Sequence, residues 1–183
     1  KDEADKDYQL AAGISQDVEA DDSILELTKA RLPWLVLALL GGFIAVKVTE
    51  QFGDAMDNYK VLFFFTPLIA AMAGNVGVQS SAIIVQGLAN NTLGGTIWQR
   101  LFKEMKLSLF NGLLLSIILL LGSHFLLGFE YIIGITVSIA LITVIVIASL
   151  IGTFVPITLN KYGIDPALAT GPFITTSNDI FGI

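Results

Sequence analysis

Residues 107–159 form an apolar stretch that is far too long to cross a membrane once. As a single α-helix rising 1.5 Å per residue, the stretch would extend about 80 Å, whereas the hydrocarbon core of a bilayer is about 30 Å thick. The stretch must therefore fold back on itself. Turn character and charge coincide within it at Gly128-Phe129-Glu130. The sequence thus predicts two antiparallel membrane spans, 107–127 and 132–159.

The rest of the chain predicts three more spans, 32–48, 61–89 and 166–183, the last beginning at Asp165-Pro166. Composition agrees with this class of protein, since only 14% of the residues are charged, against about 25% in soluble domains. The chain contains no Cys, which excludes disulfides and thiolate chemistry. We expect an all-α polytopic membrane protein with five transmembrane helices over residues 31–183.

Acidic residues gather in residues 1–30, which hold nine Asp and Glu against three Lys, while the remainder of the chain is neutral overall. This composition predicts a helical, cytosolic connecting segment in front of the membrane domain. Two interpretations stay open. The segment is either a solvated connecting helix or an element that responds to divalent cations, because clustered carboxylates bind hard cations.

The distribution of basic residues predicts the orientation of the spans. Cytoplasmic loops carry an excess of Lys and Arg, and with the N-terminus inside only Lys47 and Lys60 fall on the outer side. No internal repeat is visible, and five spans are poorly suited to enclosing a pathway within one chain. We therefore expect a pore shared by two copies. The residues on the predicted inner side are Lys29, Arg31, Arg100, Lys103, Lys106 and Lys161.

Asp179 is the one carboxylate placed inside a long apolar segment, GPFITTSNDIFGI. A charged side chain at mid-membrane costs about 3 kcal/mol on insertion scales, and such residues usually face a water-filled path or a bound ion. Asp179 is therefore the first candidate for a functional residue.

The second predicted span carries amides and small residues. Asn75, Gln79 and Gln86 share one helical face, and their side chains either hold an ion through its hydration water or fasten the bundle by hydrogen bonds. Small residues spaced four apart let helix backbones approach closely in lipid. They form the pairs Ala70/Gly74, Ala73/Gly77 and Gly77/Ser81.

Two motifs, GNVGVQSS preceded by Pro67 and DPALATGPFITTSND in the last span, resemble the transmembrane domain of the MgtE family of magnesium channels and transporters. The acidic leader followed by RLPWLVLALLGG is similar to the connecting helix and first span of that family. The resemblance covers essentially the whole chain. It implies a homodimer whose ion path follows the two-fold axis, lined by the second and fifth spans of both copies.

The resemblance further implies that Asp179 is the selectivity carboxylate, contributed twice to bind largely hydrated Mg²⁺. Thr175 and Thr176 share its helical face and could accept hydrogen bonds from ligand waters, or could instead bond back to their own helix. Gly171 could present a backbone oxygen. With Asn75 and Gln79, these residues are the expected metal-binding set.

The sequence therefore predicts a channel or transporter for magnesium or other divalent cations. We expect it to be a multi-pass protein of the cell membrane, in a bacterium the inner membrane. Expected partners are a second copy, Mg²⁺ and other divalent cations, and membrane lipid, without nucleic acid. A non-conducting membrane anchor or sensor subunit is the alternative. An intramembrane enzyme is disfavoured, because His124 and Asp179 have no recognisable nucleophile motif beside them. In one departure from the family pattern, Gln86 stands where many members have Arg.

Overall fold

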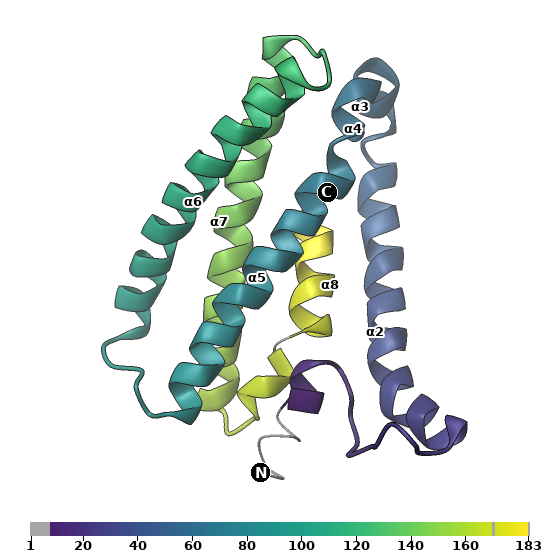
Figure 1. Cartoon of the computed structure of the whole chain (residues 1–183), viewed down its shortest axis with the longest axis vertical. Helices are drawn as coiled ribbons and strands as arrows, with labels where there is room; N and C mark the ends of the chain where they lie inside the picture. The colour runs from purple at the N-terminus through teal and green to yellow at the C-terminus, as the bar shows by residue number, and fades with distance from the viewer. Residues whose placement is uncertain (1–7, 170, 183) are drawn as a thin grey trace.

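The computed structural model describes residues 8–169 and 171–182, and all regular secondary structure within these residues is helical (Figure 1). Four helical segments of the described chain are long and apolar enough to cross a membrane, which confirms an all-helical polytopic architecture. They are α2 (Ile24–Glu50), α4 (Lys60–Phe63) with α5 (Thr66–Ala89), α6 (Ile97–Phe125) and α7 (Tyr131–Lys161). A short helix, α3 (Gly53–Asn58), connects α2 to α4.

Capping boxes set where two of the long helices begin. Ser23 caps α2 with Glu26, and Thr96 caps α6 with Gln99, each pair satisfying two backbone N–H groups that have no partner within the helix. The second box corrects the expected start of the third span. The charged residues 97–106 belong to the same helix as the apolar segment, so α6 begins ten residues before position 107.

The long apolar stretch folds back as predicted, with α6 and α7 as antiparallel neighbours (Figure 1). The turn between them passes through Gly128, which has a φ of +73°. Two reciprocal hydrogen bonds join the helices: the hydroxyls of Ser116 and Ser138 each donate to the other residue's backbone carbonyl, both at 3.0 Å. Close packing at Gly112, where a Cβ would lie 3.4 Å from the Cα of Ile142, explains how the backbones come so near.

Helix α5 packs on α7, and the short helix α8 (Pro172–Phe181) lies between α5 and α2 at mid-height of the bundle (Figure 1). The contact with α8 is the main helix contact of α2, whose remaining surface is largely exposed. Buried apolar side chains fill the junction of α5 and α7. They are Phe65, Ile69, Ala73, Val137, Val144 and Ala148.

The acidic leader, predicted to be helical, is helical only in part among the described residues. Residues 12–23 contain turns and irregular backbone, between a short helical piece at 8–11 and the start of α2, while residues 1–7 lie outside the described chain. Gly13, at a φ of +80°, ends the first piece. Side chains then compete with the helix for backbone groups: Asp22 Oδ2 accepts from the Glu19 N–H at 2.7 Å, and the Ser15 hydroxyl donates to the Ala30 carbonyl at 2.8 Å.

The last predicted span also differs from the structure. The segment after Asp165 forms a 3₁₀ helix, η1 (Pro166–Ala169), and the α-helix begins only at Pro172. Gly171, with a φ of +61°, separates the two. With ten residues, α8 is about 15 Å long and covers half of a hydrocarbon core about 30 Å thick. A fifth complete span therefore stays a prediction.

Candidate functional site

The face of α8 that carries Ile174 and Asn178 is pressed against α5. A Cβ added to Gly77 would collide with the Asn178 side chain and lie 2.8 Å from Cγ2 of Ile174. Asn178 is completely buried, and its Nδ2 donates to the Ala73 carbonyl at 3.1 Å. These contacts confirm that the small residues of the second span permit close helix approach. They also fix how α8 is rotated.

The other side of α8 faces α2 through Thr176, whose methyl group occupies the space where a Cβ on Gly41 would be. Thr175 faces α5 again, with its methyl 3.7 Å from a Cβ position on Gly74. Because successive residues of a helix are about 100° apart, Asp179 projects between the directions of Thr175 and Thr176. The carboxylate is thus directed between the side of α8 that contacts α5 and the side that contacts α2.

Asp179 is half-buried, and it forms no hydrogen bond or ion pair with any residue that the structure describes. The ion pair within the described chain, Lys47 with Glu50 at 2.6 Å, is between two exposed side chains at the end of α2. Among the described residues, no cationic side chain therefore neutralises Asp179. A carboxylate at this depth requires water, a bound cation or a second protein surface.

In the structure, Thr175 bonds back to its own helix, at the carbonyl of Gly171. The Thr175 hydroxyl donates to the Gly171 carbonyl at 3.0 Å, and the Thr175 N–H donates to the same oxygen at 3.0 Å. A carbonyl oxygen has two lone pairs, so this one has little capacity left for an ion or its water. The hydroxyl oxygen of Thr175 can still accept a hydrogen bond.

Within one copy, the structure does not bring Asn75 and Gln79 to Asp179. Both amides are exposed on α5, and Asn75 is turned about 100° away from Gly74, whose face receives α8. Gln86 is exposed on the same side. Helix α5 is continuous through this region, so its polar face is a row of side chains without an opened backbone. No cluster of three or more His, Cys, Asp or Glu side chains suited to a metal ion occurs among the described residues.

Two polar features near the site were not predicted from the sequence. The buried Ser80 hydroxyl donates to Glu104 Oε1 at 2.6 Å, which joins α5 to the N-terminal part of α6. The Asn178 Oδ1 atom is buried and has no hydrogen-bond partner in the described chain. Asn178 could have been noticed from its position four residues after Ile174. Glu104 lies before residue 107, where the predicted third span begins, and therefore was not considered as a partner within the bundle.

A family model described as a divalent cation transporter, MgtE, matches residues 66–183, which include α5, α8 and Asp179. The chain belongs to the MgtE family. The magnesium transporter MgtE of Bacillus subtilis is 36% identical over 182 residues, covering 99% of this chain and 40% of the relative. The proteins of the same name from Thermus thermophilus and Enterococcus faecalis are 31% and 30% identical, over 94% and 100% of this chain.

This MgtE chain thus spans about two fifths of the length of these relatives. Together with its four membrane-crossing helices, the family membership identifies it as a multi-pass membrane protein.

Proposed function

We propose that this chain forms the conducting membrane part of a magnesium transporter, in which two copies enclose a path for Mg²⁺ between their α5 and α8 helices. The observation that carries the proposal is the half-buried Asp179, which has no partner in the described chain and projects between the directions in which Thr175 meets α5 and Thr176 meets α2. Mg²⁺ is proposed as the ion because the relatives, which match nearly the whole of this chain, are named magnesium transporters.

The exposed face of α5 supports an assembly of two copies. Asn75 and Gln79 are exposed on a helix that is long and apolar enough to span the membrane. A polar group without a partner in hydrocarbon costs several kcal/mol, so protein or water must cover this face. A second copy would cover it and would enclose water. Two Asp179 carboxylates would then balance the charge of one divalent cation.

The chemistry of Mg²⁺ suits such a path. The ion prefers octahedral oxygen ligands and releases its waters reluctantly, so it usually keeps several of them. Asp179 supplies charge, while Thr175, Thr176, Asn75 and Gln79 accept hydrogen bonds from the ion's waters. Gly171 has a lesser part, because its carbonyl already accepts two hydrogen bonds.

The proposal includes the predicted topology of five spans with the N-terminus inside. Its support is a groove of about 410 Å³ between α5 and α7, to which Phe181 and Gly182 at the end of α8 contribute.

Mg²⁺ uptake into liposomes that contain the purified chain tests the proposed function. Asp179→Ala removes both carboxylates of the path, so uptake should fall at least about tenfold, equivalent to about 1.4 kcal/mol, while the amount of folded protein is unchanged. Asp179→Asn keeps the shape and loses the charge, so it should lose selectivity for Mg²⁺ over monovalent cations. Glu130→Gln, which changes an exposed carboxylate outside the site, is the matched control.

Normal Mg²⁺ uptake by Asp179→Ala would make the carboxylate structural and overturn the proposal. Absence of flux through the unmodified, folded chain would instead favour the alternative of a membrane anchor or sensor subunit.

A further inference from the structure

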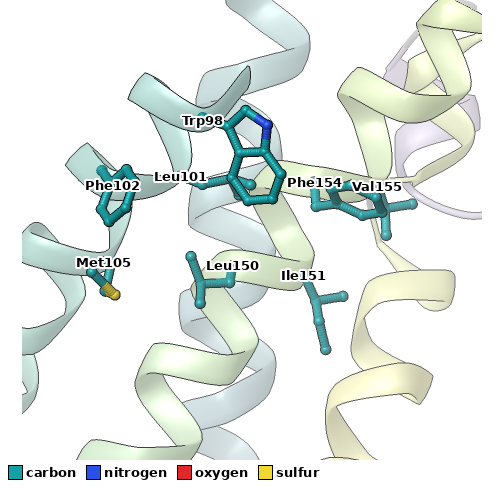
Figure 2. Close-up of a pocket in the computed structure, with 8 residues that line it drawn as sticks. All are labelled: Trp98, Leu101, Phe102, Met105, Leu150, Ile151, Phe154 and Val155. Carbon is teal, nitrogen blue, oxygen red and sulfur yellow. The ribbon is translucent and has the colours of Figure 1, made fainter. Parts of the chain in front are cut away.

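An apolar groove runs between α6 and α7 at the end of the pair where α6 begins and α7 ends (Figure 2). Its volume is about 390 Å³, within the range of about 300–1,000 Å³ that is usual for small-molecule sites. The side chains around it are almost entirely hydrocarbon. They are Trp98, Leu101, Phe102 and Met105 of α6 and Leu150, Ile151, Phe154 and Val155 of α7.

The groove exists because the residues that face each other across the two helices are small in one part of the pair and bulky in another. Farther along the pair, Gly112 and the serines at 116 and 138 allow close backbone contact. Toward the other end, bulky side chains replace these small residues, and the helices diverge (Figure 1). Trp98 and Phe102 remain 69% and 58% exposed, so the groove opens on the outside of the bundle.

Lysines flank this groove on both helices. Lys161 lies seven residues after Phe154, two helical turns along the same face of α7, and Lys106 lies four residues after Phe102 on α6. Both lysines are exposed, as is Lys103. Two acids are neighbours of these lysines: Glu104 is directed toward α5, where it accepts the hydrogen bond from Ser80, and Asp165 accepts the Ala167 N–H at 2.8 Å. The three lysines outnumber them. The rim of the groove is therefore cationic.

We infer that the groove binds one acyl chain of an anionic phospholipid, whose negative charge is attracted by Lys103, Lys106 and Lys161 around the groove. Basic pockets between transmembrane helices on the cytoplasmic side bind anionic headgroups, and Trp is enriched at the membrane interface. The apolar lining receives the chain, and the cationic rim selects the charge of the headgroup. This site is separate from the proposed ion path on α5 and α8.

Tryptophan fluorescence tests this site directly, because the chain contains only two tryptophans. Trp34→Phe leaves Trp98 in the groove as the single reporter, and Trp98→Phe leaves Trp34 on α2 as the control. Each variant is reconstituted in phosphatidylcholine vesicles that contain a fixed fraction of phosphatidylglycerol. Dibrominated acyl chains, which quench indole on contact, are carried either by the anionic lipid or by an equal amount of the zwitterionic lipid.

Brominated phosphatidylglycerol should quench Trp98 at least about threefold more effectively than brominated phosphatidylcholine, given the attraction of anionic lipid to nearby lysines. High salt should reduce this preference. The triple change Lys103→Gln, Lys106→Gln and Lys161→Gln should abolish it, while the quenching of Trp34 stays the same. The salt test uses the native lysines and therefore does not depend on how the triple variant folds.

Equal quenching of Trp98 by the two lipids would overturn the inference. Absence of quenching by either lipid would also overturn it, since the groove would then be covered by a second copy or by another part of the protein.

Discussion

The α6–α7 hairpin and the neighbourhood of α8 differ in how completely one chain satisfies their polar groups. In the hairpin, Ser116 and Ser138 exchange hydrogen bonds across the helix contact. Around α8, Asp179 has no partner among the described residues, and the amides of Asn75 and Gln79 are exposed on α5. The contact between α6 and α7 is thus satisfied within a single copy at these two serines, whereas we propose that the α8 region requires water, an ion and a second copy.

The largest expected effect comes from filling the point where α5, α7 and α8 meet. Gly77→Leu should lower the free energy of unfolding by about 3 kcal/mol, the upper part of the usual range for overpacking. The added side chain would have to displace Asn178 and Ile174 of α8, and Gly152 of α7 packs against the same glycine. Thermal unfolding of the purified protein, followed by size-exclusion chromatography in detergent, measures the change.

Gly94→Leu is the matched control for this prediction, because Gly94 has no atom within 4 Å of its Cβ position. An unchanged unfolding midpoint for Gly77→Leu would remove the small-residue face from the helix interface.

A smaller effect is expected at the contact between α8 and α2. Gly41→Ala places a methyl group against Cγ2 of Thr176, so it should cost about 1–2 kcal/mol and reduce Mg²⁺ uptake by shifting α8. Thr176→Ser removes that methyl group and should restore both stability and uptake in the double variant. A double-mutant cycle quantifies the coupling.

Gly42→Ala serves as the control here, since nothing lies within 4 Å of its Cβ position. If Gly41→Ala and Gly42→Ala behave alike, α2 does not position α8.

The smallest effect is predicted for the hairpin. Ser116→Ala should cost about 0.6 kcal/mol, the average of interhelical hydrogen bonds in membrane proteins, and should leave Mg²⁺ uptake unchanged. Thr143→Ala, whose hydroxyl bonds only to its own helix at the Ile139 carbonyl, is the reference variant. A strong loss of uptake in Ser116→Ala would show that the hairpin takes part in conduction and would remove the contrast between the two regions.

The sequence predicted the features that depend on local pattern. The fold-back followed from the length of residues 107–159, the packing face of α5 followed from the spacing of its glycines, and Asp179 stood out by its charge. The start of α6 was misplaced because a capping box at Thr96 can extend a helix through charged residues that hydropathy assigns to a loop.

The rotation of α8 could not be predicted, because it depends on contacts between segments far apart in the chain. Asn178 bonds to Ala73 at a separation of 105 residues, and Thr176 meets Gly41 on a different helix. These contacts direct Asp179 away from the amides of α5. Helical spacing alone shows which residues share a face and does not show which neighbour the face meets.

Cross-linking between copies tests the central claim most directly, and the absence of native Cys makes single-cysteine variants unambiguous. Gln79→Cys lies on the exposed polar face of α5, and Leu113→Cys lies on the exposed apolar surface of α6. Treated in the membrane with a short bismaleimide, Gln79→Cys should give a covalent dimer and Leu113→Cys should stay monomeric. A dimer from Leu113→Cys together with monomeric Gln79→Cys would contradict a path shared by two copies along α5.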